Sequence, residues 1–107
     1  MGNDYRIEYL EQFFFDLDSA AKYIKYQLNN PQAANRLIED ILGAIKKRSY
    51  NAESFEPIRS VKQRNTLYYR IYVRNYIVYY TVRTEQEEKI MEIRGVFHKS
   101  RNRYDMI

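Results

Sequence analysis

The chain has 107 residues, of which 45% are hydrophobic and 30% are charged. This length and balance predict one compact domain over residues 1–107 and exclude a disordered tail. The absence of cysteine excludes a disulfide framework, a thiolate zinc site and a cysteine nucleophile. No segment approaches the roughly 20 apolar residues of a membrane span, so we expect a cytoplasmic protein without a membrane partner.

The positive charge is concentrated in the second half of the chain. The formal net charge is +4, with 7 Lys/Arg against 9 Asp/Glu in residues 1–57 and 11 against 5 in residues 58–107. This distribution suggests an acidic or polyanionic partner for the C-terminal half. The 12 tyrosines suit half-buried sheets and nucleotide stacking equally well, so composition does not separate these uses.

The first half predicts a short strand followed by two helices. Alternating residues indicate a strand over 5–10, and apolar spacing indicates a helix over 16–29 that Asp16 or Asp18 caps. Asn30 and Pro31 have the arrangement of an N-cap and a first helical residue, so a second helix should run from Pro31 to about residue 48. The short junction makes the two an antiparallel hairpin. The predicted buried stripes are Leu17, Ala20, Ala21, Ile24 and Leu28, then Ala34, Leu37, Ile38, Ile41, Leu42 and Ile45.

The second half is rich in β-strand signals. After a loop over 49–57, the runs 67–73 and 76–82 are separated by two residues, which predicts a hairpin that pairs Val73 with Tyr76. Its core face would carry Leu67, Tyr69, Ile71, Val73, Tyr76, Val78, Tyr80 and Val82.

A charged connection over 83–89 should then lead to a last strand over 89–98. Simple alternation places Met91, Ile93 and Phe97 of this strand on one face and Glu92, Arg94, Val96 and His98 on the other.

The predicted fold is therefore α+β with the order β-α-α-β-β-β. An N-terminal helical hairpin should pack on one face of a small, mainly antiparallel sheet. Apolar matching puts Arg94 and His98 beside Arg70 on the other, partly open face, among several tyrosines. A basic and aromatic sheet face is a sensible place to bind RNA or another polyanion.

The residues also resemble a known family. The element order, the phrases 69–73 and 75–80, and the ending 95–101, which closes a strand with His98 and basic residues, resemble the RelE/ParE toxins over nearly the whole chain. The resemblance implies the toxin of a type II toxin–antitoxin (plasmid stabilisation) system, which arrests growth and is neutralised by a cognate antitoxin.

The resemblance implies two alternative targets. RelE-like members are mRNA interferases that cut messenger RNA on the ribosome, whereas ParE-like members inhibit DNA gyrase without known nuclease activity. Arg70, His98, Arg101, Arg103 and Tyr104 match the RelE pattern, but Tyr72 and Ile77 stand where that pattern has basic residues. An apolar residue at 77 looks more like ParE members. A third reading is an inactive member that only binds its antitoxin.

RNA cleavage needs an acid, a base and cations around the phosphate. His98 is the first candidate because an unperturbed histidine pKa of about 6.5 suits proton transfer. With it we expect Arg70 and Tyr104 as catalytic residues. The expected RNA and phosphate contacts are Arg94, Lys99, Arg101, Arg103 and Tyr79, with Arg59, Lys62 and Arg64 as secondary candidates.

Each candidate has a simpler structural reading. His98 fits an ordinary residue at a strand end, and Arg70 fits a cation lying across tyrosine rings. The run 99–103 fits a solvated segment or an antitoxin-docking patch. One histidine, no cysteine and the lack of a glycine-rich loop predict neither a metal site nor a cofactor.

Overall fold

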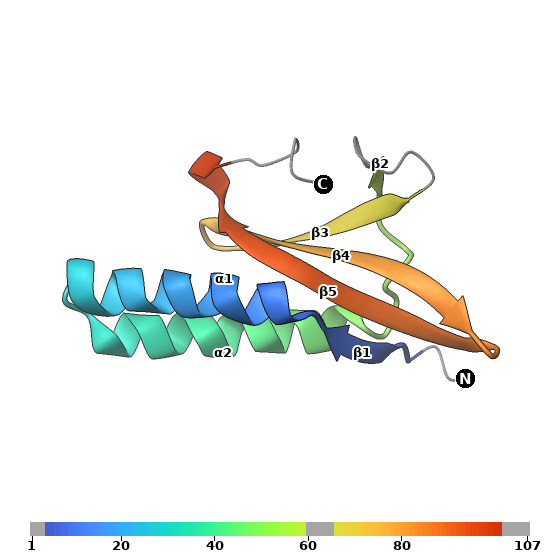
Figure 1. Ribbon diagram of the computed structural model, residues 1–107, viewed down its shortest axis with the longest axis horizontal. Helices are drawn as coiled ribbons and strands as arrows, with labels where there is room; N and C mark the ends of the chain where they lie inside the picture. Colours follow the sequence, from blue (N-terminus) through green and yellow to red (C-terminus); the bar gives the residue numbers. More distant parts are fainter. Residues whose placement is uncertain (1–3, 60–65, 102–107) are drawn as a thin grey trace.

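The computed structural model describes residues 4–59 and 66–101. Within these ranges a five-stranded sheet has the order β1-β5-β4-β3-β2, and a helical hairpin lies along one of its faces (Figure 1). The elements are β1 (Arg6–Tyr9), α1 (Glu11–Lys22), the π-helical turn η1 (Tyr23–Gln27), α2 (Pro31–Arg48), β2 (Ile58–Arg59), β3 (Leu67–Val73), β4 (Tyr76–Glu85), β5 (Glu88–His98) and the 3-10 turn η2 (Lys99–Arg101). The predicted α+β fold is confirmed, with β2 as a short addition.

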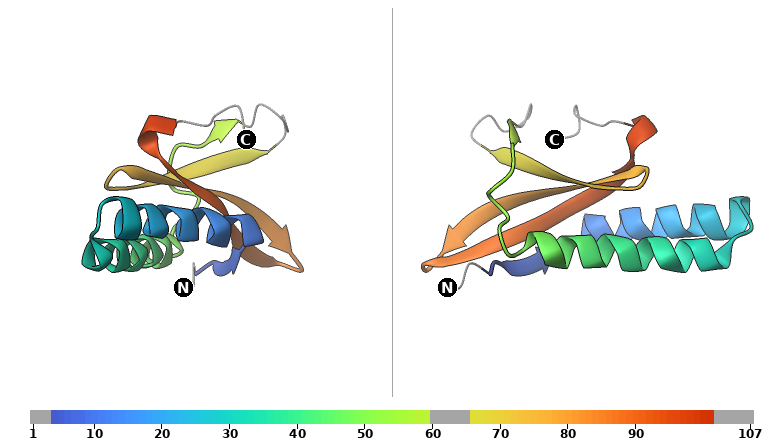
Figure 2. Two further views of the ribbon diagram at one scale, coloured as in Figure 1. Left: turned by 60° about the vertical axis from the view of Figure 1, so that its left-hand side comes forward. Right: turned by 180° about the vertical axis from the view of Figure 1, so that it is seen from behind.

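The two helices lie side by side and extend past the end of the sheet (Figure 2). The predicted start of α2 is confirmed, because Asn30 Oδ1 accepts a hydrogen bond from Ala33 N at 3.1 Å and Pro31 is the first helical residue. The predicted cap of α1 is wrong. The helix begins at Glu11 after Leu10, and Phe13, which is fully buried, anchors this extra turn in the core.

The end of the first helix departs from α-helical geometry. Residues 23–27 form a π-helical turn, in which Leu28 N donates to Tyr23 O at 3.2 Å. A π turn inserts an additional residue and rotates the side chains that follow. Leu28, which the sequence places in the buried stripe, is consequently 56% exposed.

The β3–β4 hairpin confirms the predicted register, with Val73 opposite Tyr76. Its predicted core face packs against the helices, except that Leu67 at the start of β3 is 40% exposed. The predicted charged connection over 83–89 is wrong. Strands β4 and β5 continue to Glu85 and from Glu88, and the turn between them is Gln86-Glu87, both with positive φ. This geometry suits a two-residue hairpin turn but usually carries Asn or Gly, so its sequence signal is weak.

The main core lies between the helical hairpin and the sheet. It contains Phe13, Leu17, Leu37, Ile41, Ile45, Tyr69, Ile71, Val78, Tyr80, Met91, Ile93 and Val96. The opposite face of the sheet holds a smaller buried cluster formed by Tyr68, Ile77 and Tyr79, with Ile58 and Phe97 packed against it. The sheet therefore separates two surfaces, and the face on which each candidate residue lies decides which residues can act together.

Candidate functional site

Arg70, predicted as a catalytic residue, and Arg94, predicted as a phosphate contact, share the sheet face away from the helices. The Arg70 guanidinium lies 5.9 Å from the centre of the Tyr72 ring, and that of Arg94 lies 5.5 Å from the centre of the Tyr68 ring. Arg94 also donates to Glu92 Oε1 at 2.6 Å, so part of its charge is neutralised within the protein. This basic and aromatic arrangement matches the face expected from the sequence.

Tyr79 lies on the same face but is only 1% exposed. Its ring packs 6.0 Å from that of Phe97 within the small buried cluster. A ring buried to this degree cannot stack on a nucleotide base unless neighbouring side chains move. Among the described tyrosines of this face, Tyr72 is exposed, with 63% of its surface accessible.

A β-bulge in β5 separates His98 from the two arginines. Tyr80 pairs with Ile93, but the next residue, Tyr79, pairs with Gly95, so Arg94 is the additional residue. An extra residue reverses the alternation of all side chains that follow. Val96 thereby joins the main core, Phe97 joins the opposite cluster, and His98 pairs with Tyr76 on the face that carries the helices.

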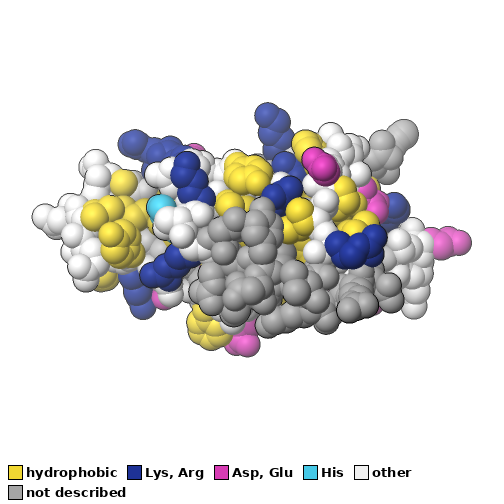
Figure 3. All heavy atoms as spheres, turned by 90° about the horizontal axis from the view of Figure 1, so that it is seen from above, with side chains coloured by type: hydrophobic (Ala, Val, Ile, Leu, Met, Phe, Trp, Pro, Cys, Tyr) yellow, Lys and Arg dark blue, Asp and Glu magenta, His cyan; other side chains and the backbone are white. Residues whose placement is uncertain are grey.

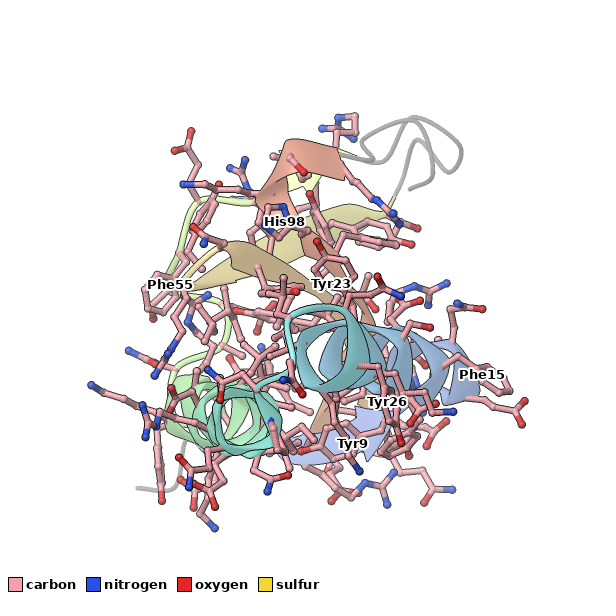
Figure 4. All side chains as sticks on the ribbon, turned by 90° about the vertical axis from the view of Figure 1, so that its left-hand side faces the viewer. Tyr9, Phe15, Tyr23, Tyr26, Phe55 and His98 are labelled. Carbon is pink, nitrogen blue, oxygen red and sulfur yellow. The ribbon has the colours of Figure 1, made fainter. Side chains whose placement is uncertain are left out.

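The predicted grouping of His98 with Arg70 and Arg94 is therefore wrong. Figure 4 shows His98 above the end of the helical hairpin, near Tyr23. The sequence error came from assuming an unbroken two-residue period through the strand. The available signal was Gly95, since a glycine inside a strand often marks a bulge.

Gly95 and Asp16 connect the bulge to α1. The Asp16 carboxylate accepts a hydrogen bond from Val96 N at 3.2 Å. Val96 lies beyond the stretch of β5, Ile90 to Ile93, that pairs with β1. A Cβ at Gly95 would lie only 2.8 Å from this carboxylate. A residue without a side chain therefore allows the helix to approach the strand at this point.

The His98 ring is held by the turn that follows it. Its Nδ1 accepts a hydrogen bond from Ser100 N at 3.1 Å and lies 2.8 Å from Ser100 Oγ. A backbone N–H can only donate, so Nδ1 is unprotonated in this arrangement and the proton of the neutral imidazole is on Nε2. The outer nitrogen is thus a hydrogen-bond donor, which is unsuitable for a general base.

The terminal basic residues are partly described. Lys99 and Arg101 are exposed on η2, at the end of β5. Tyr104 and Arg103, predicted as a catalytic and a phosphate-binding residue, lie outside the described residues, as do Lys62 and Arg64. Arg59 is exposed on β2.

The opposite end of the open face carries an ion-pair network. Arg83 contacts Glu8 at 2.6 Å and Glu92 at 2.7 Å, and Arg6 contacts Glu8 at 2.9 Å. The hydrogen bond from Arg83 lowers the pKa of the Glu8 carboxyl. Most of the basic side chains there are consequently paired, so this end has no strong excess of positive charge.

The helical hairpin exposes aromatic side chains that the sequence reading did not select. Phe14, Phe15 and Tyr26 are 52%, 59% and 66% exposed. Figure 4 shows Phe15 and Tyr26 projecting from the hairpin on a different side from His98. The sequence signal was the run 13–15, because three consecutive phenylalanines cannot all lie on one face of a helix. Exposed aromatic side chains are typical of protein-binding surfaces.

Within residues 4–59 and 66–101, no group of three or more His, Asp or Glu side chains is arranged to hold a metal ion. Among the same residues, no helix is long and apolar enough to cross a membrane. The comparison with family models decides the classification: the model described as "ParE toxin of type II toxin-antitoxin system, parDE" matches residues 7–103. The chain belongs to the ParE toxin family. This toxin has a cognate antitoxin as its partner. No curated protein and no solved structure gave a significant match to it.

Proposed function

We propose that the toxin arrests growth by binding DNA gyrase, without catalysing a reaction. The observation that carries this proposal is the bulge at Arg94 and Gly95, which places His98 on the opposite sheet face from Arg70 and Arg94. The ParE resemblance implies gyrase as the target, and the apolar Ile77 supports it because RelE-like nucleases carry a basic residue there.

The separation matters because RNA cleavage needs its groups to converge. A general base must lie within hydrogen-bond reach of the 2′-OH while cations contact the adjacent phosphate. His98 lies on the face that carries the helices and the two arginines lie on the other, so these groups do not converge on one point. Because Nδ1 of His98 accepts a hydrogen bond from Ser100 N, the proton of the neutral ring is on Nε2. This Nε2–H can donate a hydrogen bond to a binding partner.

The exposed aromatic side chains of the helical hairpin are the proposed contact with gyrase. Phe15 and Tyr26 offer large apolar surfaces that cost little conformational entropy on binding, which is why such residues often dominate binding energy. The hairpin tip, which includes Tyr26, extends beyond the end of the sheet (Figure 1), so a large partner reaches this part of the surface without a clash with the strands.

A gyrase supercoiling assay with purified protein tests the proposal. Wild-type toxin should inhibit supercoiling, the double variant Phe15→Ala/Tyr26→Ala should lose most of this inhibition, and His98→Ala should retain it. Tyr72→Ala is the matched control, because it removes an equally exposed aromatic ring from the open face of the sheet. Loss of inhibition in Tyr72→Ala alone would move the contact to the sheet, and no inhibition by the wild type would reject gyrase as the target.

One observation supports a second candidate function, that of a ribosome-dependent and metal-independent mRNA endoribonuclease. Arg70 and Arg94 share a face with the exposed Tyr72. In that reading Tyr104 would have to supply the proton transfer. Mapping of new RNA 5′ ends minutes after induction tests this candidate, because new ends within translated codons that vanish in Arg70→Ala would establish cleavage. Unimpaired growth without new ends would indicate a member that only binds its antitoxin.

A further inference from the structure

A basic and aromatic surface lies where the tip of the helical hairpin meets the end of β5. We call it the basic corner and define it by Tyr23, Tyr76, His98, Lys99 and Arg101. The rings of Tyr76 and His98 are in edge-to-face contact, with centroids 5.2 Å apart. Burial raises the pKa of Tyr76, and the nearby Arg101 guanidinium opposes this rise. The corner draws its members from η1, β4, β5 and η2.

Within residues 4–59 and 66–101, the two cations of the corner have no acidic partner. In the part of the chain that the structure describes, no carboxylate lies within ion-pair distance of Lys99 or Arg101. Other cations differ in this respect: Arg74 pairs with Asp40, and Lys22 pairs with Asp18. The positive potential of the corner is therefore available to an external partner.

The cations of the corner stand on an anchored turn. Lys99 N donates to Asn75 O at 2.7 Å, which ties η2 to the β3–β4 turn. The hydrogen bond from Ser100 N to His98 Nδ1 closes the same turn. Because the backbone under both cations is already ordered, binding there costs less conformational entropy than binding to a flexible segment.

The corner also offers apolar surface. Tyr23 is 54% exposed on the π-helical turn, and Figure 4 shows it on the side of the hairpin nearest His98. In Figure 3 the cyan His98 lies next to hydrophobic side chains at the end of the molecule formed by the hairpin tip. Two cations beside aromatic surface match a polypeptide that carries carboxylates among apolar residues. A nucleic acid would be held more firmly by a longer track of cations than these two.

We propose that the basic corner is the docking site for an acidic, amphipathic segment of the cognate antitoxin. Carboxylates of that segment pair with Lys99 and Arg101, and an apolar side chain packs on Tyr23. The segment would then occupy the side of the hairpin tip that faces His98, which is a different side from Phe15 and Tyr26. This inference goes beyond the proposed function and does not depend on gyrase being the target.

Charge reversal tests the corner directly. The binding of full-length cognate antitoxin to the full-length toxin is measured by calorimetry for the wild type and for Lys99→Glu/Arg101→Glu. We expect affinity to fall by about 10- to 100-fold in low salt, since two attractive pairs become repulsive. The difference from the wild type should shrink near 1 M NaCl, where the Debye length is only about 3 Å.

The matched control is Lys46→Glu/Lys47→Glu in the last turn of α2. These lysines are also exposed and have no described carboxylate partner, and the change in net charge is the same. Affinity in this control should stay within about threefold of wild type. Circular dichroism melts establish that both variants fold, and the neutral variant Lys99→Gln/Arg101→Gln should give an intermediate loss.

Equal effects of the corner and control variants would overturn the proposal, since only net charge would then matter. Unchanged antitoxin affinity in a folded corner variant would overturn it as well. A gel shift with duplex DNA provides the other comparison: loss of DNA binding with intact antitoxin binding would assign the corner to nucleic acid. Gyrase inhibition by the same variants is measured separately, so failure of the gyrase proposal leaves this result interpretable.

Discussion

Substitution of Gly95 by alanine should destabilise the toxin through the contact that orders the bulge. The added Cβ would lie 2.8 Å from Asp16 Oδ2, well inside the ordinary contact distance of about 3.5 Å. The Asp16 carboxylate must therefore move and weaken its hydrogen bond to Val96 N. This movement disturbs the point where α1 meets β5.

The magnitude follows from that hydrogen bond. A hydrogen bond to a charged group contributes about 1.5–3 kcal/mol, and Asp16 is half-buried and able to rotate, so we expect a loss of about 1–2 kcal/mol. For a chain of 107 residues this corresponds to a decrease in Tm of roughly 4–9 °C. Differential scanning calorimetry or a circular dichroism melt measures it.

Gly43 supplies the matched control. It lies in α2, and a Cβ built there meets no atom within 4 Å. Gly43→Ala should therefore stabilise the protein by about 0.5–1 kcal/mol, because alanine favours a helix over glycine. The two Gly→Ala changes should shift Tm in opposite directions.

A double-mutant cycle with Asp16→Ala completes the experiment. Without the carboxylate there is nothing for the new Cβ to displace, so Gly95→Ala should cost much less in that background. The reasoning is refuted if the cost of Gly95→Ala is the same in both backgrounds. It is equally refuted if Gly95→Ala stabilises the protein as Gly43→Ala does.

Three further predictions concern stability and protonation. Arg48→Ala should lower the free energy of unfolding, measured by urea titration, by about 2 kcal/mol. The reason is that the Arg48 guanidinium donates to Arg70 O and Tyr80 Oη and lies 3.5 Å from the centre of the Phe55 ring. An unchanged urea midpoint would contradict this prediction. The hydrogen bond from Lys89 lowers the pKa of Glu53, so its stabilisation is present above the ordinary carboxyl pKa and lost as pH falls through the lowered value. Melts at pH 7 and pH 3 should therefore differ less for Glu53→Gln than for the wild type, and identical differences would rule out this source. Neutral His98 should give imidazole ¹⁵N shifts of the Nε2–H tautomer, and the Nδ1–H pattern would disprove the Ser100 cap.

Several parts of the fold were predictable because their signals are local. The start of α2 depends on Asn30 and Pro31, adjacent residues that act within a single helical turn. The register of the β3–β4 hairpin depends on a two-residue turn and on alternating side chains that need no knowledge of other elements. The α+β class followed from the order of these elements.

The exposed hairpin aromatics had only an ambiguous signal. The run 13–15 indicates that some phenylalanine is exposed, but which one depends on where α1 begins. Phe13 became the buried member because the helix starts at Glu11, and burial of this ring outweighed the capping preference of the later aspartates. The π turn at Tyr23–Gln27 then redirected the side chains at the hairpin tip.

The sequence by itself determined the element order, the helical hairpin, the hairpin register and the presence of basic residues at the end of β5. Only the tertiary structure decided which of those basic residues lie together. Beside the bulge at Arg94, Val96 N donates to the carboxylate of Asp16, which is 80 residues away in the chain. A contact at such separation leaves no periodic signal in either segment, and one inserted residue was enough to move His98 to the other face of the sheet.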